Sequence, residues 1–381
     1  MNFAIKPQDI LELSMLGCMP ENPTVFSGAN GLGKSEIALQ GAREYAKSLG
    51  LTPVDTREKI PGPGEYGITW VNFSGMAPED IRWPVFSDGA YTHRITDQLP
   101  FASERWAMNG YTRDTYRGVV ICDEIGKEPD LLKMPAQWVN ERQWGNGEMV
   151  PAHVGFIFTT NDSKHNSHAY ELTSDLISRV QMFTVEKDVN SFLNYHVNGS
   201  GEKLHPLITL CCKHHGEDFL FTQDYEDPGK PFACPRSMVK ASRVLDAPEF
   251  DDKSVVHKAR LHAAIGTKAT VELLATYRAW SRLGNIEAMI SDPRKYEDEI
   301  KTFAKDNTHN GKQTIASVIA MLVKRVQKDS SQFGNVMEFF NIMGNEEDTV
   351  TFVAICVQSV PEVRTQAAFV RHYADNQIFY F

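Results

Sequence analysis

The chain has 381 residues, of which 42% are hydrophobic and 23% are charged, and its formal net charge is -10 at pH 7. This length predicts two or three packed units, and the ordinary composition excludes a largely disordered protein. The acidic net charge disfavours a protein whose main task is to coat DNA or RNA, since Lys and Arg dominate such binding. It is compatible with a local basic channel.

The first predicted elements are a buried strand over 24–27 and a helix from Lys34, where apolar residues recur with a period of 3.6. Between them, "GANGLGKS" (28–35) matches the pattern G-x-x-x-x-G-K-[ST]. The backbone N–H groups of such a loop can surround a phosphate, and the helix N-terminus adds a favourable dipole. The alternative is a Gly-rich turn that only caps the helix; the flanking strand and helix favour the phosphate loop.

This loop predicts ATP and Mg²⁺ as cofactors. Lys34 would contact the β- and γ-phosphates, and Ser35 would ligate Mg²⁺. The expected nucleotide-binding residues are Gly28, Ala29, Asn30, Gly31, Leu32, Gly33, Lys34, Ser35 and Glu36.

Two further strands follow a Pro/Gly-rich break, over 68–74 and over 118–124. The second of these, "GVVICDE", has a near-continuous aliphatic run that suits a sheet covered on both faces, and it ends in Asp123 and Glu124. Ligands of open α/β sheets bind beyond the carboxyl ends of the strands. We therefore expect Asp123 in the Mg²⁺ shell and Glu124 to orient or deprotonate the attacking water. Alone, such a pair is usually a solvated turn.

A helix near 131–141 precedes a fourth strand over 154–161, and a short fifth strand is expected over 180–185. The fourth strand ends in Asn161, whose side chain could hydrogen-bond the γ-phosphate or the water; an Asn-Asp turn is the alternative. Strands that alternate with helices predict a parallel, doubly wound α/β sheet.

After about residue 190 the pattern changes to helices. One of them, over 314–329, places five apolar residues on one face: Ile315, Val318, Ile319, Leu322 and Val326. We predict three domains: an α/β nucleotide-binding domain over 1–190, a helical lid over 191–300 and a helical C-terminal extension over 301–381.

In this order the motifs resemble those of the AAA+ ATPases, in particular their MoxR-like branch, over about 23–284. "GANGLGKS" looks like Walker A, with Asn30 in place of the more usual Pro or Gly-rich variants, and "VVICDE" looks like Walker B. "TTND" resembles sensor 1, with Asn161 in the sensing position. "LTSDLISRV" resembles the segment that ends in the arginine finger, here Arg179, and "FACPRSM" resembles the sensor 2 segment, here with Arg236.

Three other stretches carry the same resemblance. "WVNERQWGNGEMVP" is similar to the helix, Glu-Arg pair and hairpin that precede sensor 1. "SGMAPEDIRWPVF" and "LPFASERW" are similar to linking segments of this branch, especially in its bacteriophage and mobile-element members. The alternative for Arg142, in the Glu-Arg pair, is an exposed cation at a helix end.

The resemblance implies a P-loop parallel sheet flanked by helices, followed by an all-helical lid and a helical C-terminal extension. It implies a homo-oligomeric ring, expected to be a hexamer, in which Arg179 reaches the neighbour's γ-phosphate. Arg236 would contact the nucleotide of its own subunit and couple the lid to nucleotide state. The alternative for either arginine is a surface ion pair.

The leading functional hypothesis is an ATP-hydrolysing, MoxR-like AAA+ ring motor that remodels or assembles a protein client. Members of this branch often act with a von Willebrand A domain protein, so by analogy such a partner is expected here. Client-facing candidates are "RQWGNGEMVP" and the inserted region around "SDGAYTHRITDQ". One alternative is an AAA+ helicase or loader acting on DNA, which the acidic charge disfavours. Another is a nucleotide-switched structural or regulatory subunit, against which Glu124 and Arg179 argue because both serve hydrolysis.

Two further stretches, one with metal-ligand residue types and one apolar, are interpreted as buried packing segments and not as binding sites. "CCKHH" (211–215) has metal-ligand residue types, but adjacent helical residues do not share a face, so a partly buried helix is preferred over zinc. "VMEFFNIM" is expected to be buried, although an exposed "FFNIM" could dock a partner.

The cysteines and the apolar runs predict the compartment. The six cysteines form no CxxC pair, no basic segment precedes an apolar run at the N-terminus, and no apolar run approaches about 18 residues. We therefore expect a reduced, cytoplasmic, soluble protein with no membrane partner.

Overall fold

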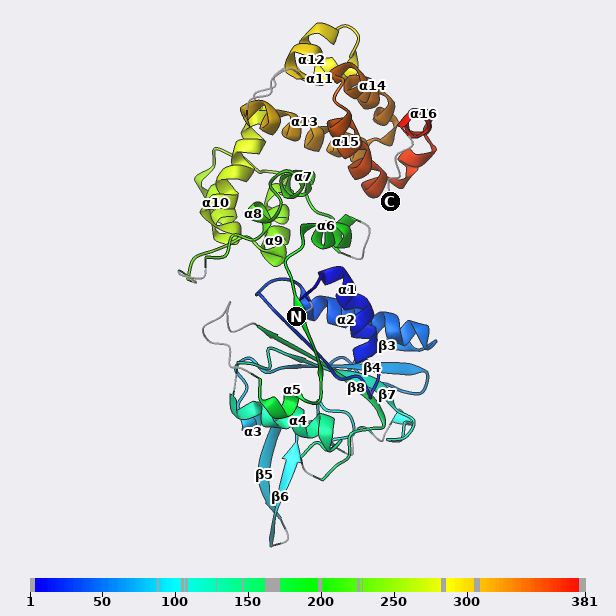
Figure 1. Cartoon of the computed structure of the whole chain (residues 1–381), viewed down its shortest axis with the longest axis vertical. Helices are drawn as coiled ribbons and strands as arrows, with labels where there is room; N and C mark the ends of the chain where they lie inside the picture. Colours follow the sequence, from blue (N-terminus) through cyan, green and yellow to red (C-terminus); the bar gives the residue numbers. More distant parts are fainter. Residues whose placement is uncertain are drawn as a thin grey trace. The chain divides into compact units, whose positions relative to one another are not determined.

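The computed structural model describes residues 4–87, 89–103, 106, 109–127, 129–145, 147–161, 172–197, 201–224, 227, 229–281, 286–304 and 309–376. The chain divides into two compact units, Met1–Asp188 and Val189–Phe381. Figure 1 shows strands and helices in the first unit and helices in the second.

The first unit is built on a parallel sheet, which in the described residues has seven strands in the order β1-β9-β2-β8-β7-β4-β3. Strand β2 lies between β9 and β8, and β8 separates β2 from β7. The strand bounds are Ala4–Ile5 (β1), Thr24–Gly28 (β2), Thr52–Asp55 (β3), Glu65–Asn72 (β4), Arg117–Asp123 (β7), His153–Asn161 (β8) and Gln181–Val185 (β9). The predicted α/β fold with a parallel sheet and a helical C-terminal part is confirmed.

Helices cover both faces of this sheet. On one face lie α1 (Pro7–Gly17) and α2 (Lys34–Ser48), which pack closely because residue 41 is glycine: a Cβ there would lie 2.3 Å from Ser14 Cβ. The other face carries α4 (Lys133–Asn140) and α5 (Ser174–Ile177), after a short 3-10 turn at Pro129–Leu131. Two-sided burial explains the continuous aliphatic run of β7.

Between β4 and β7 the chain forms a short helix, α3 (Pro78–Ile81), and an antiparallel hairpin of β5 (Arg82–Ser87) and β6 (Ala90–Ile95). Figure 1 shows this hairpin projecting from the rest of the first unit. It occupies the region that the sequence interpreted only as an insertion; Asp88 at its turn lies outside the described residues. The hairpin, β1, α1 and β3 are elements that sequence reasoning missed.

The second unit consists of helices. Their bounds are Val189–Val197 (α6), Pro206–His215 (α7), Glu217–Leu220 (α8), Pro235–Leu245 (α9), Val255–Ser281 (α10), Ile286–Ser291 (α11), Glu297–Ala304 (α12), His309–Lys328 (α13), Phe333–Met343 (α14), Glu346–Ser359 (α15) and Ala367–Asn376 (α16), with 3-10 turns at Ser330–Gln332 and Pro361–Thr365. Helix α10 is divided by a kink at Gly266, whose φ is +74°.

One hydrophobic cluster in this unit extends from Phe192 to Val363. It contains the predicted apolar face of α13, which is buried as expected, and Phe339 and Phe340 of the "FFNIM" stretch. Residues before and after position 300 therefore share a core, while the division into a lid and an extension stays a prediction. In the described part of the chain, no helix has both the length and the apolar character needed to cross a lipid bilayer.

Candidate functional site

The loop between β2 and α2 encloses the side chain of Lys34. Gly31 and Gly33 have φ of +76° and +87°, a region that favours glycine, so the chain can turn tightly into α2. Lys34 is 6% exposed, and its Nζ donates to the carbonyl oxygens of Gly28 at 3.0 Å and Ala29 at 2.8 Å. The loop backbone thus holds the lysine ammonium at the N-terminus of a helix, where anions are favoured.

The other predicted loop residues differ in burial. Ala29 and Leu32 are buried, Asn30 and Ser35 are partly buried, and Glu36 is exposed in the first turn of α2.

Lys34 also contacts the end of strand β8. Its Nζ donates to Asn161 Oδ1 at 3.2 Å, and both side chains are buried. This contact forms because β8 is the direct neighbour of β2, with Gly28 in register with Asn161. Asp162, the next residue of the "TTND" stretch, lies outside the described residues.

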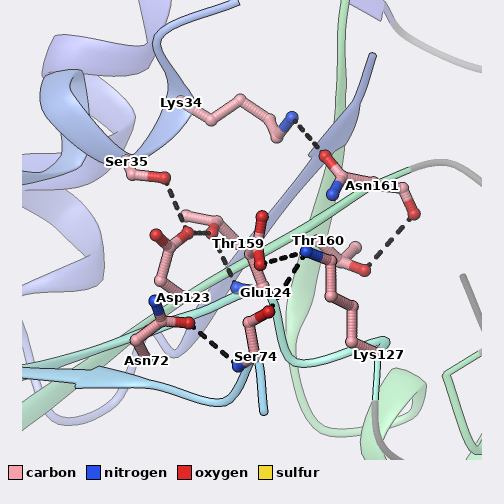
Figure 2. Close-up of polar contacts among 10 residues, drawn as sticks. All are labelled: Lys34, Ser35, Asn72, Ser74, Asp123, Glu124, Lys127, Thr159, Thr160 and Asn161. Atoms are coloured by element: carbon pink, nitrogen blue, oxygen red, sulfur yellow. Dashed lines mark hydrogen bonds and ion pairs between the residues drawn. The ribbon is translucent and has the colours of Figure 1, made fainter. Parts of the chain in front are cut away.

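Ser35 at the start of α2 and Asp123 at the end of β7 meet beside this lysine, although β8 lies between β7 and the strand β2 that leads into the loop. Ser35 Oγ donates to Asp123 Oδ1 at 2.6 Å, as Figure 2 shows. Mg²⁺ prefers oxygen ligands and is usually held by one or two carboxylates together with substrate phosphates and water. The described residues contain no group of three or more His, Cys, Asp or Glu side chains that could hold a metal. The paired hydroxyl of Ser35 and carboxylate of Asp123 are oxygen ligands that would fit a Mg²⁺ ion whose shell the phosphates complete.

Glu124 follows Asp123 in a left-handed backbone conformation. Its φ is +59°, a region that costs a non-glycine residue about 1–3 kcal/mol. The carboxylate forms an ion pair with Lys127, with 2.5 Å between Oε2 and Nζ. Lys127 Nζ also donates to Ser74 Oγ at 3.2 Å, and Ser74 N–H donates to Asn72 Oδ1 at 2.9 Å (Figure 2). The base candidate is thus tied to the segment that follows β4.

Thr159 on β8 contacts both acidic residues. Its hydroxyl donates to Asp123 Oδ1 and accepts from Glu124 N–H at 3.4 Å. The sequence assigned no role to Thr159, which lies in the "TTND" stretch, or to Lys127, which follows the acidic pair. One signal for Thr159 was available, since it lies two residues before Asn161 and strand side chains alternate between faces.

Cys122, the residue before the acidic pair, takes no part in the chemistry of the site. Burial, with a smaller contribution from the charge of Asp123, raises the pKa of the Cys122 thiol well above its usual value. The thiol therefore stays protonated at neutral pH, and the chemistry of this strand end belongs to the two carboxylates.

The three predicted arginines lie in different surroundings. Arg179, just after α5, pairs with the carboxylate of Asp175 and donates to Asp175 O at 2.6 Å; its side chain is partly exposed. Arg236 is exposed near the start of α9 in the second unit. Arg142 is not an exposed helix-end cation, because its guanidinium donates to Pro151 O at 2.7 Å and to Val154 O at 3.0 Å.

Arg142 instead closes a local turn. Its carbonyl accepts from Val150 N–H at 2.7 Å, and the guanidinium carbon lies 5.5 Å from the centroid of the Phe156 ring. Burial lowers the pKa of the guanidinium from its usual value, although an arginine remains charged. Arg142 therefore supports the hairpin before β8.

Comparison with known proteins adds little to this geometry. No protein-family model and no curated protein matches the chain. Similar solved structures include the ORC2 protein of Aeropyrum pernix in ADPNP-ADP complexes, at 12% identity over 89% of this chain and 93% of that chain with a TM-score of 0.38. Another is NtrX from Brucella abortus in complex with ATP, at 11% identity over 90% and 68% with a TM-score of 0.32. These scores are too low to support an argument, so the interpretation rests on the site itself.

Proposed function

We propose that the protein is an ATP-hydrolysing motor of the AAA+ class. One observation carries the proposal: side chains from three separate segments gather at one edge of a parallel sheet. They are Lys34 and Ser35 at the start of α2, Asp123 and Glu124 at the end of β7, and Asn161 at the end of β8. A turn that merely capped α2 would not require a buried lysine, a hydroxyl on a carboxylate and a polar strand end side by side.

Each side chain has a distinct part in this proposal. Lys34 leaves the carbonyls of its own loop for the β- and γ-phosphates, a charge-assisted contact that is stronger than a contact to neutral oxygens. Ser35 and Asp123 would hold a Mg²⁺ ion, which would supply positive charge opposite the phosphates. Glu124 exchanges Lys127 for the attacking water, which it orients or deprotonates. Asn161, already beside Lys34, hydrogen-bonds the γ-phosphate or that water.

Two arginines extend the proposal to an assembly. Arg179 would leave Asp175 and reach the γ-phosphate in a neighbouring copy, which requires a ring, and a hexamer is the expected form. Such a finger can contribute on the order of 10³ or more in rate. Arg236 would contact the nucleotide of its own copy from the helical unit and couple the motion of a lid to nucleotide state.

The proposed task is MoxR-like remodelling or assembly of a protein client, with a von Willebrand A domain protein as the partner by analogy. The β5–β6 hairpin supports a client-facing element, because Phe86 and Tyr91 are 65% and 77% exposed and their rings pair at 5.2 Å. Exposed aromatic side chains on a projecting ribbon are typical of interaction surfaces.

A DNA-acting motor is the second candidate, and one feature of the same hairpin favours it. Phe86 pairs with Tyr91 across the ribbon, and His93 is two residues along the same strand from Tyr91, opposite Pro84. The Arg82 guanidinium donates to His93 Nδ1 at 3.1 Å, so the aromatic pair and a guanidinium share one face of the hairpin. Such a face can stack bases and attract phosphates. ATPase assays with and without single-stranded DNA, across a salt series, separate the candidates: strong salt-sensitive stimulation contradicts protein remodelling.

The client is best identified with a variant that binds ATP and does not hydrolyse it. Glu124→Gln in the presence of ATP should stay assembled and retain its client, so proteins that co-purify with this variant and not with Lys34→Ala are the candidates. Recovery of the same proteins with both variants would contradict nucleotide-driven client binding. A purely nucleotide-switched subunit is excluded if the wild-type protein turns over ATP and client addition changes the rate.

A further inference from the structure

Thr159 links the two acidic residues of the site, although the resemblance of the "TTND" stretch gives a role only to Asn161. Its hydroxyl donates to Asp123 Oδ1, and Glu124 N–H donates to its oxygen at 3.4 Å. Its carbonyl accepts from Ile125 N–H at 3.1 Å. The residue is 1% exposed, so bulk water does not compete for these contacts. A single buried threonine therefore contacts three consecutive residues of the chain that leaves β7.

The first of these contacts restricts the Asp123 carboxylate. Asp123 Oδ1 accepts from two hydroxyls, those of Ser35 and Thr159. Two donors on one oxygen limit the rotation of the carboxylate about its terminal bond, and hydrogen bonds to a charged acceptor are stronger than those to a neutral one. Ser35 comes from α2 and Thr159 from β8, so the carboxylate is fixed from both sides.

The other contacts restrict Glu124. Its φ of +59° is uncommon for a residue with a side chain. The hydroxyl of Thr159 accepts from Glu124 N–H, and the carbonyl of Thr159 accepts from the next N–H, that of Ile125. These two hydrogen bonds flank the φ and ψ of Glu124 and hold its backbone. The direction in which the Glu124 side chain leaves the strand is therefore set partly by Thr159.

We propose that Thr159 is a positioning residue for Mg²⁺-dependent ATP hydrolysis. It fixes the Asp123 carboxylate for its contact with the metal shell and fixes the backbone of Glu124, and it touches neither nucleotide nor metal. The inference rests on the proposed function. Removal of a partner that orients a metal-binding group typically lowers metal affinity 10–100-fold, so loss of this hydroxyl should weaken the Mg²⁺-dependent part of nucleotide binding about tenfold.

The neighbouring Thr160 provides a matched control. It is also buried, but its side chain points to the other side of β8, and its hydroxyl donates to Asn161 O at 3.4 Å. Thr159→Val and Thr160→Val thus delete the same group from adjacent buried positions. Thr159→Ser keeps the hydroxyl and removes only a methyl group.

The test measures the affinity of the full-length variants for a fluorescent, non-hydrolysable ATP analogue, in EDTA and across a Mg²⁺ titration, together with their melting temperatures. For Thr159→Val we expect wild-type affinity in EDTA and a Mg²⁺ midpoint about tenfold higher than that of the wild type. Thr159→Ser and Thr160→Val should match the wild type in both. If Thr159→Val does not fold, the comparison of Thr159→Ala with Thr159→Ser likewise separates a variant without the hydroxyl from one that keeps it.

Two results would overturn the proposal. An unchanged Mg²⁺ midpoint in Thr159→Val, or an equal loss of affinity with and without Mg²⁺, would show that Thr159 serves only the packing of β8. If the wild-type protein binds no nucleotide, the proposed function fails and this inference fails with it. If the wild type binds Mg²⁺ and nucleotide but Thr159→Val behaves like Thr160→Val, the proposed function stands and only the positioning role of Thr159 is contradicted.

Discussion

Lys34 Nζ lies 3.2 Å from Asn161 Oδ1, although 127 positions separate the two residues in the chain. The contact exists because β8 pairs with β2 and places its last residue in register with the last residue of β2. The same strand reaches Asp123 and Glu124 through Thr159, on its other neighbour β7. Strand β8 is therefore the physical link between the phosphate loop and the acidic pair.

Arg179 and Glu124 should act at the same catalytic site from different copies of the chain. Arg179→Ala is expected to keep nucleotide affinity and to lose turnover by on the order of 10³. A mixture of Arg179→Ala with Glu124→Gln should regain part of the turnover, because some interfaces then combine an intact Glu124 with an intact Arg179. Steady-state ATPase assays of each variant and of the mixture check this.

The mixture has a matched control in the double variant Glu124→Gln/Arg179→Ala combined with Arg179→Ala at the same ratio. In this control no interface combines an intact Glu124 with an intact Arg179, so turnover should not recover. Mixed assemblies must be confirmed by exchange of differently tagged copies. Wild-type turnover by Arg179→Ala alone would mean that this arginine is only the partner of Asp175 seen in the single chain.

Lys127 should restrain Glu124 before hydrolysis. The two side chains are 32% and 29% exposed, and a partly exposed ion pair is worth at most about 1 kcal/mol. Lys127→Met should therefore raise basal kcat by no more than about fivefold, since Glu124 no longer has to leave the ammonium. Lys133→Met, at an exposed position on α4, is the control. A loss of turnover in Lys127→Met would instead show that the ammonium assists hydrolysis.

Phe86 and Tyr91 should couple the client to ATP turnover. The double variant Phe86→Ala/Tyr91→Ala removes the exposed aromatic pair at the end of the hairpin, remote in sequence from the loop and the acids. Basal turnover should stay at the wild-type rate, while stimulation by a client should fall at least about fivefold, as expected when a buried aromatic anchor of an interface is truncated. Val370→Ala, on an exposed position of α16, is the control.

Equal stimulation of the wild type and the hairpin variant would contradict a client-facing role. The assay is run with protein captured by the Glu124→Gln trap and, separately, with single-stranded DNA. Loss of stimulation in the DNA arm alone would favour the nucleic-acid candidate.

Asp348 should make the helical unit less stable as pH rises. Burial, together with the charge of Glu347, raises the pKa of this carboxyl from 3.8 to about 6. The native state then holds the proton more tightly than the unfolded state, so its stabilising contribution is complete below about pH 4 and is lost as pH rises through about 6. Asp348→Asn should stabilise the protein by about 1 kcal/mol at pH 7.5 after allowance for solvent screening.

The measurement is the difference in free energy of unfolding between wild type and Asp348→Asn, from urea denaturation at pH 4.5 and pH 7.5. This difference should grow with pH. The same value at both pH values would mean that Asp348 titrates with an unperturbed pKa in the folded protein.

The parts of the fold that sequence reasoning found are those with strong local signals. Glycines 31 and 33 mark the turn into α2, and the aliphatic run before Asp123 marks a strand buried on both faces. The β5–β6 hairpin carried no such signal: it has no buried face along most of its length, and Pro84 lies inside one strand, where proline argues against strand assignment. Strand β1 has only two residues and is defined by its pairing with β9.

The same distinction applies to the candidate site: some of its residues are predicted by local motifs, and others are found only in the structure. Lys34, Ser35 and Asp123 follow from motifs, because each needs a fixed position relative to a strand end or a helix start. Spacing places Thr159 on the same strand face as Asn161, but it does not reveal the contacts of Thr159 with Asp123 and Glu124, which depend on which strands are neighbours. The ion pair of Lys127 depends on where its side chain turns after the strand.

The central claim is that the loop around Lys34 binds ATP and that Glu124 serves its hydrolysis. The most direct measurement is ATP affinity and turnover, side by side, for the wild type, Lys34→Ala and Glu124→Gln. We predict that Lys34→Ala loses detectable binding, whereas Glu124→Gln binds ATP at least as well as the wild type and loses turnover by on the order of 10² or more. Equal nucleotide binding by the two variants, or wild-type turnover by Glu124→Gln, would contradict the account.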